Sequence, residues 1–260
     1  MTNDLAFSIN CLNQLSSGLR YVKAEFEAEG TRSEDLSLLK HLVASSSCSL
    51  VIKIGGSHAI RDITEASNLQ VEHVLVPMIE TAESLQLFLN QINAASLSVP
   101  YYKTFPSFLL NIETFTTVTN LDSIIDVLRD NHLFKGFVIG RSDLVGSLGL
   151  SAEHINSQHI YDICSAILDK CNHFSYPVTL GGGITSSSIP FITALYAKGL
   201  SAYETRKVAI NLDSRSVKDI HNHINLSLQF ERSTIKVMNR LSSIINSKSL
   251  NRIKDLESRL

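Results

Sequence analysis

The 260-residue sequence has no tryptophan, only four cysteines and no long apolar run. The cysteines lie far apart and form no Cys-x-x-Cys pair, which argues against a structural zinc site or a disulfide framework and favours a reducing, cytoplasmic compartment. No apolar run reaches the roughly 18 residues that a membrane span needs. The N-terminus has neither the basic nor the apolar segment of a secretory signal. We therefore expect no membrane partner.

The sequence also lacks a strong excess of either charge. It contains 23 Lys and Arg residues and 25 Asp and Glu residues, which gives a formal net charge of -2. This balance provides no basic surface for nucleic acid. Hydrophobic residues make up 44% of the chain, which excludes disorder over most of its length. The length fits one large domain or two small ones.

Short apolar segments alternate with helix-like segments along most of the chain. The apolar segments lack clean polar alternation, as expected of parallel strands that are buried on both faces. The predicted strands are residues 20–27, 50–54, 72–79, 105–112, 136–140, 177–180 and 203–210. The predicted helices are residues 33–44, 59–67, 82–95, 122–131, 157–171 and 187–198.

This alternation predicts a parallel sheet with helices outside it. Closure into a (β/α)8 TIM-type barrel, with one strand not recognised, is the most economical arrangement. A doubly wound open sheet is the alternative, although no Gly-x-Gly-x-x-Gly motif follows the first strand. We expect residues 1–212 to form the barrel, with its first strand not identified.

The pattern changes in the C-terminal part of the chain. Residues 213–246 contain no Gly or Pro, and their apolar residues recur at helical spacing. A helix of this length would span roughly 45–50 Å, which exceeds the flank of a barrel. We expect residues 213–260 to form a helical extension that either folds back as a hairpin or reaches a second subunit. Leu250, Ile253 and Leu256 suggest a further short amphipathic helix.

Polar side chains cluster where the predicted strands end, which is where a barrel carries its active site. Glu113 and Asp143 end two consecutive strands. Neighbouring parallel strands are about 4.8 Å apart, so the two carboxylates could share one hard divalent cation. Each carboxylate could instead cap the helix that follows it, and the spacing alone does not decide between these interpretations.

The first predicted strand carries alternating charges. Lys23, Glu25, Glu27 and Glu29 share one face because side chains alternate along a strand. An outward, solvated face is the simplest interpretation for an isolated strand. In a closed barrel both faces are covered, and buried charges are costly without partners. A barrel therefore favours a functional cluster near its mouth.

Other strand ends carry a lysine and two glycine-rich loops. Lys53 is followed by Gly55-Gly56, and residues 181–183 form a Gly-Gly-Gly run. Such loops let the backbone approach an anion, although turn geometry alone also selects glycine. Glu204 and Arg206 share a face of the last predicted strand, for which we expect an internal ion pair.

Four segments resemble a known family: FVIGRSDLVGSLG, LLNIETFTTVTNLDSII, VLVPMIETAES and VIKIGG. They are similar to the HpcH/HpaI aldolase and citrate lyase β-subunit family of the phosphoenolpyruvate/pyruvate barrel superfamily. The similarity runs in order from about residue 20 to residue 210. Its most specific part is the strand-end glutamate followed by a Gly-x-x-Asp-Leu-x-x-Ser-x-Gly motif.

The resemblance implies a (β/α)8 barrel that forms a homo-oligomer, such as a trimer or hexamer, with exchanged C-terminal helices. It implies Mg²⁺ or Mn²⁺ on Glu113 and Asp143 and a 2-oxo acid that chelates this metal. The implied reaction makes or breaks a carbon–carbon bond through a metal-bound, pyruvate-type enolate. The residues expected to contact the substrate are Arg141, Ser142, Gly182 and Gly183.

Three positions depart from the family pattern. Members with known aldolase activity carry a His in the loop after the first predicted strand, but here this loop reads EAEGTR. Lys53 stands where Arg is usual, so a compact ammonium group replaces a planar guanidinium that could form two parallel hydrogen bonds. Arg141 occupies a position that is usually small. We therefore take Lys53, Glu25 and Glu27 as the candidate catalytic residues, with a glutamate, metal-bound water or the substrate as general base.

These observations predict a divalent-metal-dependent carbon–carbon lyase that acts on a 2-oxo acid or a related carboxylate. One alternative is a non-catalytic barrel that binds a small acid or serves as a subunit of an assembly, which the missing His and the C-terminal extension favour. The other is a thioester lyase or a phosphoenolpyruvate-using transferase of the same superfamily.

Overall fold

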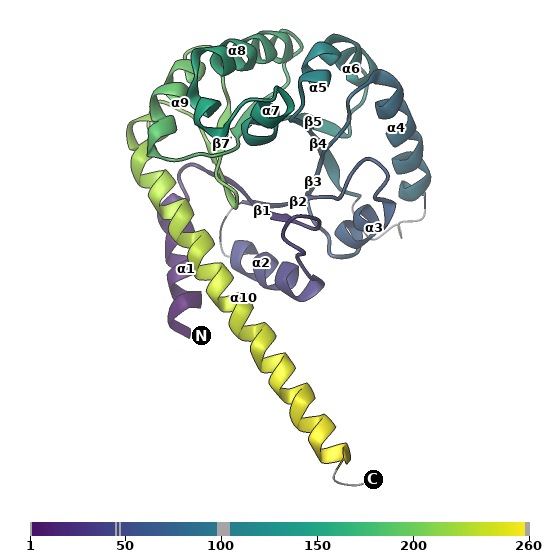
Figure 1. Cartoon of the computed structure of the whole chain (residues 1–260), viewed down its shortest axis with the longest axis vertical. Coiled ribbons are helices and arrows are strands. Elements are labelled where there is room, and N and C mark those ends of the chain that lie inside the picture. Colours follow the sequence, from purple (N-terminus) through teal and green to yellow (C-terminus); the bar gives the residue numbers. More distant parts are fainter. Residues whose placement is uncertain (1, 45, 47, 98–104, 258–260) are drawn as a thin grey trace.

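Eight strands close into a barrel with helices around it (Figure 1) in the computed structural model, which describes residues 2–44, 46, 48–97 and 105–257. The strands follow one another around the barrel in chain order. They are β1 (Leu19–Glu25), β2 (Ser49–Lys53), β3 (His73–Val76), β4 (Ser107–Ile112), β5 (Phe134–Gly140), β6 (Val178–Gly181), β7 (Ala202–Glu204) and β8 (Val208–Asn211). This arrangement confirms the TIM-type α/β barrel that the sequence predicts.

The last strand differs from the prediction. Residues 203–210 were expected to form one strand, but they form a hairpin in which β8 is antiparallel to both β7 and β1. The turn is short, and the Thr205 amide donates to the Val208 carbonyl at 2.9 Å. Since β7 is parallel to β6, this turn lies at the carboxyl ends of the parallel strands. The expectation that the first strand was the unidentified one is wrong: the first predicted strand is β1, Thr2–Leu15 form a helix, and the strand that was not recognised is the antiparallel β8.

The helices cover the outside of the barrel (Figure 1). They are α1 (Thr2–Leu15), α2 (Ser33–Ala44), α3 (Ile60–Asn68), α4 (Ala82–Ser96), α5 (Phe115–Thr119), α6 (Leu121–Leu128), α7 (Arg141–Ser147), α8 (Gln158–His173), α9 (Ile189–Tyr196) and α10 (Ile220–Glu257). Short 3-10 turns span Ala152–Asn156, Ser186–Ser188 and Ser216–Asp219. The predicted helical segments are confirmed within a few residues, while α1, α5 and α7 were not predicted.

The barrel interior changes from apolar to charged along its axis. A small cluster of buried side chains, separate from the larger hydrophobic core, fills the barrel interior: Tyr21, Val51, Leu75, Leu109, Val138 and Ala209. Side chains alternate across a strand, so residues two positions further toward the carboxyl ends also point inward. In β1, β2 and β4 those residues are Lys23, Lys53 and Asn111. The sequence thus builds an apolar floor beneath a charged mouth.

The long helix α10 is fixed to the barrel through α1 (Figure 1). The Ser8 and Ser233 hydroxyls lie 2.7 Å apart in the buried contact between the two helices. Arg240 forms an ion pair with Asp4 near the end of this contact. Beyond it α10 continues without folding back and projects past the barrel. In the described part of the chain, no helix has an apolar stretch that could span a bilayer.

Candidate functional site

A cavity of about 360 Å³ opens at the carboxyl ends of the parallel strands. Its walls come from strand ends and the loops that follow them, as expected for the site of a TIM-type barrel. The lining residues are Lys23, Glu25, Ala28, Lys53, Asn111, Gly140, Ser142, Asp143, Gly182, Gly183, Ile184, Glu204, Thr205 and Arg206. The structure therefore brings together six of the nine predicted site residues, and Glu113 lies directly behind them.

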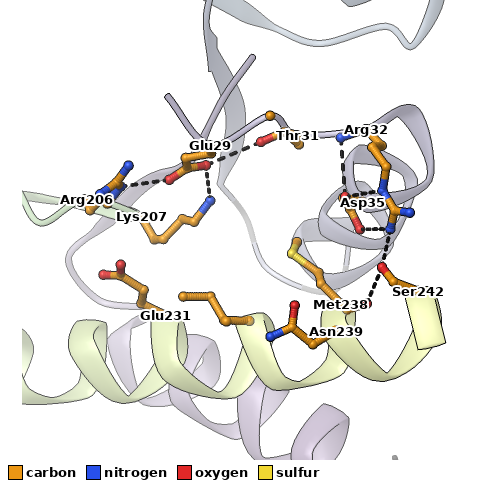
Figure 2. A pocket seen from close by; sticks show the side chains of 12 residues that line it. Glu29, Thr31, Arg32, Asp35, Arg206, Lys207, Glu231, Met238, Asn239 and Ser242 are labelled. Carbon is orange, nitrogen blue, oxygen red and sulfur yellow. Dashed lines mark hydrogen bonds and ion pairs between the residues drawn. The ribbon is translucent and has the colours of Figure 1, made fainter. Parts of the chain in front are cut away.

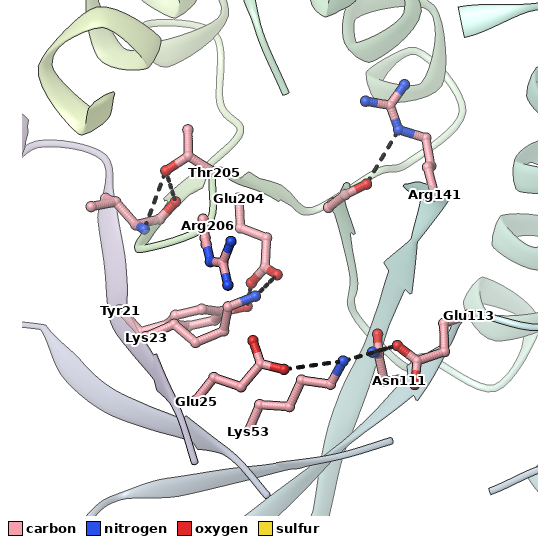
Figure 3. A network of polar contacts seen from close by, with 12 residues as sticks. Tyr21, Lys23, Glu25, Lys53, Asn111, Glu113, Arg141, Glu204, Thr205 and Arg206 are labelled. Carbon is pink, nitrogen blue, oxygen red and sulfur yellow. Dashed lines mark hydrogen bonds and ion pairs between the residues drawn. The ribbon is translucent and has the colours of Figure 1, made fainter. Parts of the chain in front are cut away.

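Lys53 is the centre of a polar network in this cavity (Figure 3). Its ammonium lies 3.1 Å from Glu113 Oε2 and 3.7 Å from Glu25 Oε1. The Asn111 side-chain amide donates to the same Glu113 oxygen. Asp143 lies in the first turn of α7, on the wall of the same cavity. Strand alternation explains the convergence, because Glu113 continues the inward-facing series of Leu109 and Asn111.

Negative charge exceeds positive charge around Lys53. Burial alone would lower the pKa of Lys53, but Glu113, Glu25 and Asp143 outweigh this effect and raise it above its usual value. Burial raises the pKa of Glu113. The neighbouring carboxylates of Asp143 and Glu25 also raise it, whereas Lys53 lowers it. Three carboxylates thus share one ammonium group, and the position favours an additional cation.

The donor chemistry beside Glu113 fits a hard divalent cation. The Asn111 Oδ1 atom is buried and has no hydrogen-bond partner among the described residues. Carboxylate and amide oxygens of this kind are preferred ligands of Mg²⁺ and Mn²⁺. In the described part of the chain, no three His, Cys, Asp or Glu side chains form a ready metal-binding group. Glu113, Asp143 and Asn111 are therefore the donors that the chain offers, and the other ligands would be water or substrate.

A second buried network lies on the hairpin side of the cavity (Figure 3). Glu204 forms an ion pair with Lys23 and accepts a hydrogen bond from the Tyr21 hydroxyl at 2.6 Å. Burial and the nearby Glu204 carboxylate raise the pKa of Tyr21 well above its usual value. The predicted pairing of Glu204 with Arg206 is wrong. Arg206 Nε lies 3.0 Å from Glu29 Oε1 instead.

The predicted substrate contact of Arg141 is revised by the structure. Its side chain is fully buried and points away from the cavity (Figure 3). The guanidinium also lies 4.7 Å from the centre of the Phe191 ring. Burial lowers the pKa of Arg141 to about 10. Its hydrogen-bond acceptors are the carbonyls of Gly181, Gly182 and Ile155, the Asn156 side chain and the Ser188 hydroxyl. Arg141 thus positions the loops around the mouth.

Gly182 packs its backbone closely against the start of α7. Its φ is +80°, and a Cβ placed there would lie 2.5 Å from the Ser142 amide nitrogen and 2.6 Å from the Arg141 amide nitrogen. Only glycine fits this close approach of two backbones. Ser142 and Gly183 are exposed at the same wall. Gly182 thus lets the loop after β6 pack against the start of α7 at the wall of the mouth cavity.

Two other predicted features lie outside the cavity lining. Glu27 follows the end of β1 and is exposed, so only Glu25 of the two candidate bases borders the cavity. The Gly55 amide donates to Asp62 of α3 at 2.9 Å, so this glycine loop is hydrogen-bonded to the helix that follows it. Asn111 was not among the predicted site residues, although its spacing of two from Glu113 predicts that both side chains face inward.

Comparisons with solved structures give the same fold. The citrate synthase SbnG matches with a TM-score of 0.57 at 15% identity, over 88% of this chain and 90% of that chain. An HpcH/HpaI aldolase from Desulfitobacterium hafniense DCB-2 matches with a TM-score of 0.58 at 11% identity, over 83% and 86%. An HpcH/HpaI aldolase/citrate lyase family protein from Burkholderia cenocepacia J2315 gives 0.56 at 14% identity, over 72% and 80%.

Sequence comparison identifies the family. No curated protein matches the chain. The family description HpcH/HpaI aldolase/citrate lyase, in contrast, matches residues 27–176, which is more than half of the sequence. This stretch contains Lys53, Asn111, Glu113 and Asp143, whereas the hairpin side of the mouth lies beyond it. The chain therefore belongs to the HpcH/HpaI aldolase/citrate lyase family.

Proposed function

We propose that the protein is a divalent-metal-dependent carbon–carbon lyase of the aldolase type that acts on a 2-oxo acid or a related carboxylate. The observation that carries this proposal is the excess of carboxylates at the mouth. Glu25, Glu113 and Asp143 surround a single ammonium group, and the unpartnered Asn111 oxygen lies beside them. This arrangement supports a cation and a chelating acid in one small cavity.

The residues of the mouth divide into three roles in this proposal. Glu113 and Asp143 would hold Mg²⁺ or Mn²⁺, which supplies Lewis-acid stabilisation of charge that develops on the 2-oxo oxygen. Lys53 keeps its proton and adds a fixed positive charge next to the reacting acid. Ser142 and the Gly182-Gly183 wall leave space for the substrate carboxylate. The cavity of about 360 Å³ limits the substrate to a small molecule.

Glu25 is the best placed protein base in this scheme. It borders the cavity, and its carboxylate lies 3.7 Å from Lys53 Nζ. It can accept a proton from the substrate carbon while Lys53 balances its charge. Glu27 is exposed and outside the lining, so we assign it no direct contact. Removal of this proton would generate the enolate that aldolase chemistry requires.

The exchange of pyruvate methyl protons in D₂O tests the proposed chemistry. We expect the exchange, followed by NMR, to require Mg²⁺ or Mn²⁺, because proton removal next to the 2-oxo group needs charge stabilisation. We also expect either metal to raise the melting temperature, since a ligand specific to the native state stabilises it. Glu113→Gln combined with Asp143→Asn should abolish both effects.

A matched control variant shows whether the effects of the double substitution are specific to the mouth. Asp122→Asn with Asp126→Asn removes two exposed carboxylates of α6 that do not line the mouth cavity, and should change neither effect. An unchanged metal-induced shift in the Glu113/Asp143 variant would refute the metal assignment.

A barrel that only binds a small acid is the second candidate function, because Lys53 already neutralises part of the charge of Glu113. Lack of exchange across a panel of 2-oxo acids would favour that binding function.

A further inference from the structure

The β7–β8 hairpin carries an arginine over the mouth of the barrel. Arg206 lies in the turn of this hairpin, at the same end as Glu113 and Asp143, and its side chain is 55% exposed. It lines the mouth cavity. It also lines a neighbouring cavity of about 400 Å³ between this turn, the β1–α2 loop and α10 (Figure 2). The guanidinium therefore borders the space in which the proposed substrate would lie.

The turn that presents Arg206 is held firmly on both sides. The Thr205 hydroxyl is hydrogen-bonded to the backbone of Val208, which closes the turn. Lys207 is buried and forms an ion pair with Glu29. Glu204 is fixed in the barrel by Lys23. The backbone under Arg206 is thus pre-organised, which lowers the cost of using its side chain for recognition.

The guanidinium of Arg206 retains free donors. Its Nε donates to Glu29 Oε1 at 3.0 Å, and neither terminal amino group makes a hydrogen bond with the residues that the structure describes. A guanidinium can bind a carboxylate or a phosphate through two parallel hydrogen bonds. The other cations of the mouth are already engaged, since Lys53 pairs with Glu113 and Lys23 pairs with Glu204. Arg206 is therefore the cation best placed to bind a ligand anion on the hairpin side.

We propose that Arg206 determines substrate specificity by binding a second anionic group, a carboxylate or a phosphate, at the end of the substrate away from the 2-oxo acid. The proposal deepens the proposed function and rests on it, because it requires the 2-oxo acid to bind near Glu113 and Asp143. Figure 3 places Arg206 beside Glu204 and Lys23, on the side of the network opposite Asn111 and Glu113. A substrate with charge at both ends could therefore contact both sides of the mouth.

Two acids of equal chain length test the proposal by isothermal titration calorimetry in the presence of Mg²⁺. 2-Oxoglutarate carries a distal carboxylate where 2-oxopentanoate carries a methyl group. We expect the wild-type protein to bind 2-oxoglutarate about tenfold more tightly, as a charge-assisted contact provides. Arg206→Gln should reduce this ratio to about one and leave 2-oxopentanoate binding unchanged, and Arg206→Lys should retain part of the ratio. The same comparison of 3-phosphonopyruvate with pyruvate tells whether a phosphonate, as the analogue of a phosphate group, is also bound through Arg206.

Arg32 provides the matched control. Its side chain is 44% exposed and pairs with Asp35 at 3.1 Å, and it lines the neighbouring cavity but not the mouth cavity (Figure 2). Arg32→Gln should therefore leave the ratio unchanged. The proposal is overturned if wild type binds neither acid, if it binds both equally, or if Arg206→Gln keeps the preference. Deuterium exchange separates the two hypotheses: exchange without a dianion preference rejects the role of Arg206, whereas an Arg206-dependent preference without exchange rejects the lyase reaction alone.

Discussion

Side-chain alternation in β5 decides which residues near the predicted metal ligands reach the mouth. Val138 belongs to the interior cluster of the barrel, so Gly140 also faces inward and Arg141 faces outward. The sequence pattern already contained this information, and applying it would have excluded Arg141 as a substrate contact. The same rule, started from Leu109, leads to Asn111. The alternation of side chains along a strand therefore predicts which residues face this site better than closeness in the sequence does.

The partners of the charged residues could not be predicted in the same way. Glu204 and Arg206 share a face in the sequence pattern, yet Glu204 pairs with Lys23 from β1 and Arg206 pairs with Glu29. Inside a closed barrel, side chains from different strands meet according to the stagger of the strands. That stagger depends on the register of every pair of neighbouring strands. The sequence showed which charges exist but not which of them meet.

Replacing Gly182 with alanine tests the wall of the mouth. The Cβ would overlap the Ser142 and Arg141 amides, so the loop must move in addition to adopting an unfavourable φ of +80°. We expect Gly182→Ala to lose more stability than the roughly 1–2 kcal/mol that positive φ alone costs, and to weaken 2-oxo acid binding. Urea unfolding and calorimetry measure the two effects. Gly149→Ala is the matched control, because Gly149 has a φ of +69° and open space around its Cβ position. Equal losses in both variants would contradict this role of Gly182.

At the scale of elements, the alternation of strands and helices could be predicted because buried parallel strands are short continuous apolar runs. The hairpin was read as one strand because its turn, Thr205-Arg206-Lys207, lacks the Gly or Asn that usually marks a hairpin. Helix α1 was missed because its buried face packs on α10, which is encoded at the other end of the chain. Local sequence patterns predict elements that local interactions determine. The β7–β8 hairpin and α1 depend instead on contacts with segments far away in the sequence.

The start of α10 is expected to be sensitive to acid. His223 is 3% exposed, its Nδ1 atom has no hydrogen-bond partner among the described residues, and its Nε2 lies 3.6 Å from Asp219. Burial lowers the pKa of His223 and outweighs the opposite effect of Asp219 and Asp213. The unfolded chain therefore binds a proton more readily than the native protein. This difference lowers stability as pH falls through the unfolded value of about 6.5.

Urea unfolding between pH 7.5 and pH 5.5 tests this expectation. His223→Gln removes the titrating group, so the free energy of unfolding should decline less steeply with falling pH than in the wild type. The absolute stability of this variant is not the readout, because the substitution also changes packing. His221→Gln, at an exposed position on the same helix, should keep the wild-type slope. Identical slopes for wild type and His223→Gln would refute the assignment.

At the scale of the whole molecule, α10 has two parts with different surroundings. Its first part packs against α1, through contacts that include Ser8 with Ser233 and Asp4 with Arg240. Removing this part would expose the face of α1 that packs on it, so truncation directly after the barrel would destabilise the fold. The remainder of α10 projects past the barrel (Figure 1). A helix of this kind is not expected to stand alone in water, and a second subunit is the partner that the family resemblance implies.

Truncation after Ser243 separates the two parts of α10 and tests the expected homo-oligomer. The shortened chain keeps the Ser8–Ser233 and Asp4–Arg240 contacts, so we expect the barrel to stay folded with little change in melting temperature. If the projecting part joins subunits, the mass measured by light scattering should fall from that of a trimer or hexamer toward that of a smaller species. Arg240→Gln in the full-length chain is a control that weakens only the contact with α1 and should leave the mass unchanged. A full-length protein that is already monomeric, or a folded truncated chain with undiminished mass, would show that α10 does not hold subunits together.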